Sequence, residues 1–296
     1  AYVGNMGRKL IGRTDINAPL RQADASSANI NQRRPMWPVF QVVNVRSGFI
    51  NSSYNALQTR AEKRFNHGVT LLASYTLGKW IDDASWYDDT SFFADQRNVR
   101  LNRGLGEQDQ RQVMALSWVW APRAFAGAAG PRRALLGGWA VNGIASFYAG
   151  QPLRVRSGRD NDFDSYPNGD RPDVVGDWKL SPNRTRDEVI QAWFTPGAFT
   201  ANQPGQVGNL GRNVVIGPGF KGVDLGVSKN IRIREGHQIQ FRAESFNAFN
   251  WVNLGDPITD LTKNTFGRIT STAVATTAAT SQRDARVFQF GLKYVF

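Results

Sequence analysis

The chain ends in the stretch ARVFQFGLKYVF, residues 285–296, in which bulky apolar side chains alternate with other residue types. Five alternate positions carry the large apolar residues Phe288, Phe290, Leu292, Tyr294 and Phe296. Gln289, Gly291 and Lys293 lie between them, so the stretch predicts a β-strand with one aromatic face. In water, such a strand at a sheet edge promotes aggregation. The fold therefore depends on whether water or lipid covers the aromatic face.

The same alternation recurs along the chain and predicts further strands. Apolar side chains occupy every second position of five other stretches, whereas helical periodicity is almost absent. These stretches are VTLLASYTL (69–77), QVMALSWVW (112–120), WAVNGIASF (139–147), GVDLGVSKN (222–230) and QIQFRAE (238–244). With additional strands expected near residues 53–64 and 1–4, the pattern predicts an all-β, antiparallel fold of about eight strands. Alternation alone is equally compatible with a soluble β-sandwich.

The lengths of the connections favour a membrane barrel. Short turns are expected at FNHG (65–68) and RIREGH (232–237). Long polar segments lie between the predicted hairpins, at roughly 5–50, 81–108, 150–218 and 250–283. Loops of this length are uncommon in compact soluble domains, but long extracellular loops alternating with short periplasmic turns are typical of outer-membrane barrels. The pattern therefore predicts a transmembrane β-barrel in the bacterial outer membrane.

Composition excludes several other classes of protein. The 296 residues include no cysteine, so disulfides and thiolate metal sites are excluded. The net charge of +12 comes from basic residues spread along the chain, so no nucleic-acid partner is expected. No stretch approaches the ~20 apolar residues that a membrane-spanning helix requires. Because the chain starts at Ala1 without a signal peptide, we expect a processed protein or a fragment.

Charged and titratable residues give little indication of catalysis. The two histidines, His67 and His237, fall in predicted turns and have no partner at metal-ligand spacing. We therefore expect no enzyme, no metal site and no cofactor. Several charged residues fall on the polar faces of predicted strands, where they are expected to pair with one another in a wet barrel interior. These residues are Arg60, Glu62, Arg64, Arg242 and Glu244.

Five tryptophans are expected near the ends of the strands. Trp118, Trp120 and Trp139 fall near the short-turn ends. Trp80 and Trp251 fall near the ends that carry the long segments. Two aromatic levels at opposite strand ends are what the two membrane interfaces select, so we expect an interfacial girdle. Ordinary core tryptophans are the alternative.

Acidic residues in the long segments are candidates for binding. DNDFDSYPNGD, residues 160–170, superficially resembles a calcium loop, but Arg171 replaces the bidentate Glu expected at position 12. A solvated outer loop is therefore favoured over an ion site. Another acidic pair precedes Trp86 at the top of a predicted strand, where charges also need no ligand. The candidate loop contacts to a ligand are Asp82, Asp83, Asp160, Asp162 and Asp164.

Five stretches together resemble the C-terminal part of an Oar-like TonB-dependent outer-membrane receptor. Residues 208–257 carry the most specific part of the resemblance, with GNLGRNVVIGPGFKGVDLGVSKNI and IQFRAESFNAFNWVNLGDP. The other stretches are SSYNALQTRAEKRFNHGVTLLASYTLGKWIDDAS (52–85), DQRQVMALSWVW (109–120) and GGWAVNGIASFYAGQPL (137–153).

The resemblance implies a 22-stranded barrel around an N-terminal plug, with outer loops that capture a scarce solute for TonB-driven import. It also implies that the barrel-assembly machinery reads the closing aromatic strand, which then faces outer-membrane lipid. Plug, TonB box and N-terminal regulatory domain do not occur in this sequence. We therefore expect residues 1–296 to be the C-terminal part of the barrel, which reaches TonB through a plug outside this sequence.

Two other functions remain open at this point. The first is a free-standing, eight-stranded outer-membrane barrel that acts as an adhesin or as a structural envelope protein. The second is a soluble β-sandwich that binds a ligand such as a carbohydrate. Within the receptor reading, the solute is also open, because siderophores, oligosaccharides, peptides and exported proteins would all be bound by variable loops.

Overall fold

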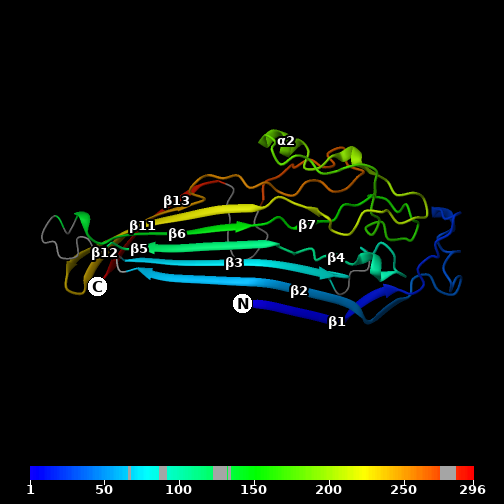
Figure 1. Cartoon of the computed structure of the whole chain (residues 1–296), viewed down its shortest axis with the longest axis horizontal. Helices are drawn as coiled ribbons and strands as arrows, with labels where there is room; N and C mark the ends of the chain where they lie inside the picture. The colour runs from blue at the N-terminus through cyan, green and yellow to red at the C-terminus, as the bar shows by residue number, and fades with distance from the viewer. Residues whose placement is uncertain (66–67, 87–91, 123–131, 133–134, 274–284) are drawn as a thin grey trace.

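The computed structural model describes residues 1–65, 68–86, 92–122, 132, 135–273 and 285–296. The chain is dominated by one antiparallel sheet of long strands that run side by side (Figure 1). Its eight long strands are β1 (Tyr2–Asp15), β2 (Asn44–Phe65), β3 (Val69–Asp82), β5 (Gln112–Trp120), β6 (Trp139–Tyr148), β11 (Phe220–Arg234), β12 (His237–Phe246) and β13 (Val287–Val295). They are adjacent in chain order, so the predicted all-β, antiparallel succession of strands is confirmed.

Short elements occupy the long connections and the edge of β3. The two-residue strands are β4 (Gly104–Leu105), which pairs with β3, β7 (Pro152–Leu153), β8 (Asp173–Val174), β9 (Phe199–Thr200) and β10 (Val215–Ile216). The helical elements are η1 (Ser27–Asn29), η2 (Val99–Asn102), α2 (Arg186–Gln191) and η3 (Pro196–Ala198). Among the described residues, no helix combines the length and the apolar character needed to cross a bilayer.

The strand register joins the apolar sides of the predicted strands into one surface, here called the apolar face. Directly paired residues of antiparallel strands point to the same side of a sheet. Phe241 pairs with Leu292 in β13, and Ala243 pairs with Phe290. From β12 the same side continues across every strand to β2. Its directly paired positions include Val227, Val141, Trp120, Val69 and Phe65. The opposite surface is called the polar face.

The polar face carries the charged residues that were expected there. Glu62 lies between two arginines on β2, 3.3 Å from Arg60 and 3.2 Å from Arg64. On β12, the Arg242 side chain donates a hydrogen bond to Gln240 at 2.8 Å. Glu244 lies on the same face, directly opposite Gln289 of β13 in the strand register. The expected pairing within this face is confirmed for Arg60, Glu62 and Arg64.

The strands extend further into the predicted long segments than the sequence indicates. β1 continues to Asp15 and β2 begins at Asn44, so the first long connection spans 16–43 and not 5–50. Two register shifts, between Gly7 and Ile11, interrupt the pairing of β1 with β2. Such irregularities insert unpaired residues and change which face a side chain occupies. They therefore hide the alternation on which the sequence-based boundary depends.

The sheet has two different ends and two open edges. The turns before β3 and β12 lie at one end, here called the short-turn end, and the long connections gather at the other (Figure 1). Within the described part of the chain, β1 pairs only with β2, and β13 pairs only with β12. The described strands therefore form an open sheet whose two edge strands are β1 and β13.

Candidate functional site

The long connections pack together into a layer with its own hydrophobic core at the end opposite the short turns. Three phenylalanines form its centre: Phe194 lies 5.2 Å from Phe199 and 5.0 Å from Phe266, between ring centroids. Leu153, Val155, Leu210 and Val215 are buried around them. This layer is called the loop layer below. Because its residues come from connections far apart in sequence, polar side chains from several loops are held in fixed positions.

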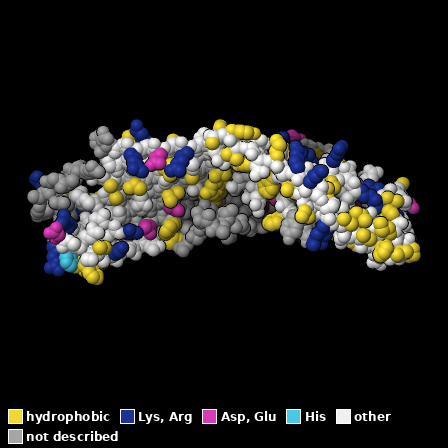
Figure 2. Space-filling view, turned by 90° about the horizontal axis from the view of Figure 1, so that it is seen from below, with side chains coloured by type: hydrophobic (Ala, Val, Ile, Leu, Met, Phe, Trp, Pro, Cys, Tyr) yellow, Lys and Arg dark blue, Asp and Glu magenta, His cyan; other side chains and the backbone are white. Residues whose placement is uncertain are grey.

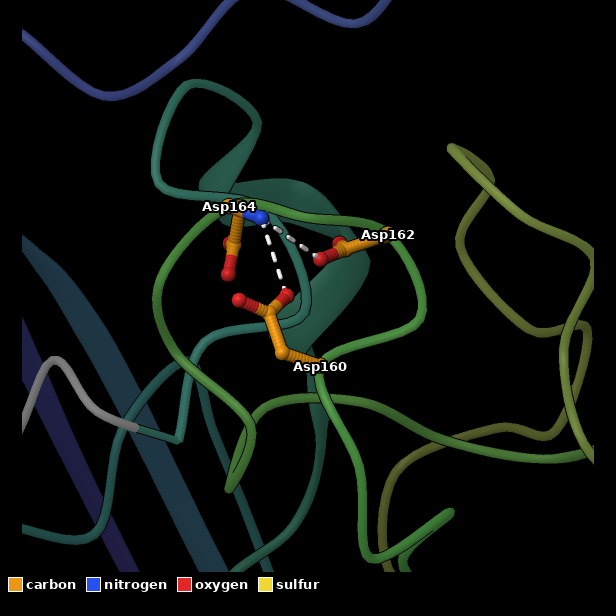
Figure 3. A group of neighbouring side chains, drawn as sticks. All are labelled: Asp160, Asp162 and Asp164. Atoms are coloured by element: carbon orange, nitrogen blue, oxygen red, sulfur yellow. Dashed lines mark hydrogen bonds between the residues drawn. The ribbon is translucent and has the colours of Figure 1, made fainter. Parts of the chain in front are cut away.

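The three aspartates of the 160–164 stretch converge within this layer (Figure 3). Asp160 accepts hydrogen bonds from the backbone nitrogens of Asp164 at 3.0 Å and Ser165 at 2.9 Å. Asp162 accepts from Asp164 N as well, at 3.2 Å. Phe163 and Ser165 have positive φ angles of 54° and 76°, which fold the chain tightly around the carboxylates. The local backbone therefore directs the three side chains toward one another.

Burial contradicts the expectation of a solvated loop. Asp162 is 1% exposed and Asp164 is 6% exposed, while Asp160 is partly buried. The loop is covered because the 16–43 connection contacts it. Arg21 forms an ion pair with Asp162 at 2.9 Å, and Arg33 donates a hydrogen bond to the carbonyl of Phe163. The sequence gives no local sign of these contacts, since Arg21 and Arg33 are more than a hundred residues away in the chain.

The electrostatics of this acidic cluster favour protons or cations. Burial, and next the Asp162 carboxylate, raise the pKa of Asp164 to about 9. The same two causes raise the pKa of the adjacent Asp170 to about 8. One oxygen from each of Asp160, Asp162 and Asp164 lies within 4.8 Å of the others. Such carboxylate oxygens are the ligands that hard cations such as Ca²⁺ prefer.

The carboxylates of Asp82 and Asp83 bind other residues of the protein. Asp82 is fully buried and forms an ion pair with Arg212, which also donates to Ser85 at 2.8 Å. Asp83 accepts from Asn51 N at 2.8 Å and lies 3.3 Å from Arg103. Both carboxylates thus fasten the end of β3 to the long connections, and Asp83 also holds it to Asn51 of β2. Neither is exposed toward a solute.

A pocket of about 290 Å³ opens beside this layer and was not anticipated. It is lined by Phe92, Glu107, Pro152, Leu153, Arg154, Arg156 and Thr259. Arg154 forms an ion pair with Glu107 and lies 3.4 Å above the ring centre of Phe92, and Arg156 donates to Asn168 at 3.1 Å. The alternation in PLRVRS (152–157) is the sequence signal for this arrangement, because Leu153 and Val155 enter the core while both arginines face the pocket.

Four of the five predicted girdle tryptophans lie with the apolar face. Trp118, Trp120 and Trp139 are directly paired with Leu71, Val69 and Lys229 near the short-turn end. At the other end, Trp251 lies 5.0 Å from Phe249 and 6.5 Å from Phe147 between ring centroids. The prediction that Trp80 belongs to this girdle is wrong. It pairs with Tyr54 on the polar face, where its indole donates to Ser52 at 2.8 Å.

The side chains of the last strand are the most exposed apolar group of the sheet. Phe288, Phe290, Leu292, Tyr294 and Phe296 are all exposed, and Phe296 is 89% exposed. Phe290 stacks on Phe241 at 6.4 Å, and Tyr294 stacks on Phe296 at 5.8 Å. This aromatic row therefore continues the apolar face to its edge at β13.

One known protein family matches almost the whole chain. The model of a family described as "Outer membrane beta barrel domain" matches residues 1–289. No curated protein matches the chain.

Proposed function

Because the chain belongs to the outer membrane beta barrel domain family, and so lies in the bacterial outer membrane, we propose that it forms barrel strands of a TonB-dependent receptor. The receptor binds a scarce solute at its extracellular loops and imports it through a plugged lumen. The observation that carries this proposal is the run of eight paired strands, in which the edge strands β1 and β13 each pair with a single neighbour among the described residues.

The two faces of the sheet fit lipid on one side and a lumen on the other. The apolar face carries the aromatic row of β13 and the tryptophans Trp118, Trp120, Trp139 and Trp251. The polar face carries the Arg60–Glu62–Arg64 ion pairs. In membrane barrels, apolar side chains face lipid, whereas charges are tolerated inside the lumen. Lipid contact of the apolar face also explains how the exposed aromatic strand avoids aggregation in water.

The edge at β1 supports additional strands in the assembled barrel. Within a bilayer, unpaired backbone groups at a sheet edge are too costly to remain, so barrels close. Val39 and Phe40, in the connection that follows β1, are exposed. Figure 2 shows hydrophobic side chains gathered at the end of the molecule where this connection lies in Figure 1. Neighbouring strands and loops of a larger barrel would cover this surface.

The loop layer supports solute capture in this proposal. Its core fixes the pocket beside Arg154 and Arg156 at the end of the sheet that carries the long connections. Long connections of such barrels are extracellular. A pocket there that combines charged side chains, such as Arg154, with apolar ones, such as Phe92, suits first contact with a solute, and this contact requires no catalytic step. TonB would supply energy through a plug, and the barrel-assembly machinery would recognise Phe288, Phe290, Leu292, Tyr294 and Phe296.

The proposal is tested on the protein isolated from outer membranes. The intact mass is measured, and the protein is photo-crosslinked to TonB in cells. A receptor requires a polypeptide several times heavier than these 296 residues, together with a TonB adduct that disappears when the energy-transducing complex is removed. A polypeptide of about the mass of this chain, without any TonB adduct, would contradict the receptor.

A free-standing small barrel is the second candidate. Its support is the number of long strands, because eight strands can close around an interior filled with side chains. Such a barrel would act as an adhesin or as a structural envelope protein. It predicts direct pairing between β1 and β13, which the receptor excludes.

A further inference from the structure

A groove interrupts the apolar face over β2 and β3, beside the start of β1. Its volume is about 340 Å³, and its main lining residues are Tyr2, Asn55, Leu57, Leu77, Lys79 and Arg111. Leu57 and Leu77 are a directly paired couple on the apolar face, and Asn55 pairs with Lys79 one step toward the long connections. The groove therefore changes from apolar to polar and cationic in the direction of the loop layer.

The polar wall of the groove offers hydrogen-bond donors. The Tyr2 hydroxyl donates to Asn55 Oδ1 at 2.6 Å, while the Asn55 amide nitrogen makes no hydrogen bond to the described residues. Asn55 is exposed, so this amide donor is accessible to a polar group of a bound molecule. The groove therefore offers apolar contacts at Leu57 and Leu77 and a hydrogen-bond donor at Asn55.

The charge at this end of the groove is positive. Lys79 and Arg111 are exposed, and Arg111 bonds the carbonyl of Gly78 at 3.3 Å. Asp109 is the neighbouring acid, but it is buried and accepts a hydrogen bond from Trp80 N at 2.6 Å. Burial raises the pKa of Asp109 more than Arg111 and Lys79 lower it. The two exposed cations, Lys79 and Arg111, therefore outnumber the single neighbouring carboxylate, Asp109, which is buried.

Other lysines of the apolar face are placed differently. Lys63 lies 5.8 Å from the ring centre of Phe65 near the short turns, and Lys221 lies 4.9 Å from that of Trp251. Those contacts suit ordinary snorkelling of lysine at a membrane interface. Only Lys79, among these three, lines a groove.

We propose that this groove binds a phosphorylated glycolipid of the outer leaflet, with an acyl chain against Leu57 and Leu77 and a phosphate between Lys79 and Arg111. The long-connection end of a family member lies outside the cell, which places both cations at outer-leaflet headgroups. The proposal depends on the membrane location of the chain. It does not depend on solute import.

The test measures lipid retained on the protein. The full protein is extracted from outer membranes in mild detergent, and bound phosphorylated glycolipid is quantified by native mass spectrometry. Lys79→Gln combined with Arg111→Gln should lower occupancy about tenfold, as expected from losing charge-assisted contacts. Lys221→Gln is the matched control and should retain the wild-type occupancy. Heat-modifiable gel mobility confirms that each variant remains folded.

A second variant tests the apolar part while keeping both cations. Ser53, which also lines the groove, is replaced by Phe to fill it, and this change should expel the glycolipid. Wild-type protein without bound glycolipid would overturn the proposal, as would equal retention by all variants. Displacement by phosphatidylglycerol vesicles as readily as by the glycolipid would overturn it too. So would a polypeptide found in place of lipid.

Discussion

At the scale of single residues, the buried charges are the features that sequence reasoning described least well. Asp82 and Asp162 were expected to meet solvent or a ligand, yet both are almost completely buried. Their partners, Arg212 and Arg21, come from connections more than a hundred residues away in the chain. No periodicity carries such information, because it depends on how the loops pack. The same limit applies to Trp80, whose level along β3 was predicted but whose face was not.

Asp164→Asn should remove a pH dependence of the loop layer. The folded-state pKa of Asp164 is about 9, above the ordinary value near ~4 for an unfolded aspartate. The protonated carboxyl therefore stabilises the fold fully at low pH, and this contribution is lost as pH rises through about 9. We expect a loss on the order of a few kcal/mol in the wild type and a flatter profile in the variant.

Hydrogen exchange of residues 160–170 between pH 5 and pH 10, with a metal chelator present, measures this effect after correction for intrinsic exchange rates. Asp177→Asn, at an exposed position, serves as the control and should behave like the wild type. Increasing protection of the wild-type loop toward high pH would contradict the prediction.

Arg212→Ala should be strongly destabilising. Asp82 is fully buried, and removing its guanidinium partner leaves an uncompensated charge, which costs about 3–5 kcal/mol. Arg60→Ala removes an exposed ion pair and should cost no more than about 1 kcal/mol. Urea unfolding of the reconstituted protein measures both free energies. Similar costs for the two variants would mean that Asp82 finds another partner.

At the scale of elements, the period-2 pattern located the long strands because apolar and polar residue types alternate along them and place apolar side chains on one face. It placed β3, β5, β6, β11, β12 and β13 close to their observed positions. It missed the length of β1, where irregular pairing and the polar residues Arg8 and Lys9 interrupt the alternation. Short elements such as α2 depend on the Thr185 cap and on local packing, so hydrophobic periodicity gives no sign of them.

Arginine substitutions should distinguish the two faces of β11 and β12. Leu225 and Phe241 are on the apolar face, where Leu225→Arg or Phe241→Arg should cost about 2–4 kcal/mol near the bilayer midplane. Asp224→Arg and Gln240→Arg, on the polar face, should cost far less. Folding free energies in lipid vesicles, measured by tryptophan fluorescence against urea, provide the comparison. Equal costs on both faces would show that lipid does not contact the apolar face.

At the scale of the whole molecule, the two edge strands of the described sheet, β1 and β13, determine what completes the structure. Backbone groups at β1 and β13 require partners inside a bilayer. The chain order of the sheet allows only two solutions: the edges pair with each other, or each pairs with another strand of a larger barrel. The first solution gives the small barrel, and the second gives the receptor.

Disulfide trapping between the two edges distinguishes these solutions. The sequence contains no cysteine, so every crosslink in a double-cysteine variant is informative. Met6→Cys with Ser53→Cys is the positive control, because these residues pair directly between β1 and β2 and neighbouring strands fall within disulfide range. Met6→Cys is then combined in turn with Phe288→Cys, Phe290→Cys or Leu292→Cys of β13. The receptor predicts a crosslink in the control alone, since intervening strands separate the edges. Efficient oxidation of any β1–β13 pair within monomers would establish a closed barrel of eight strands and exclude the larger one.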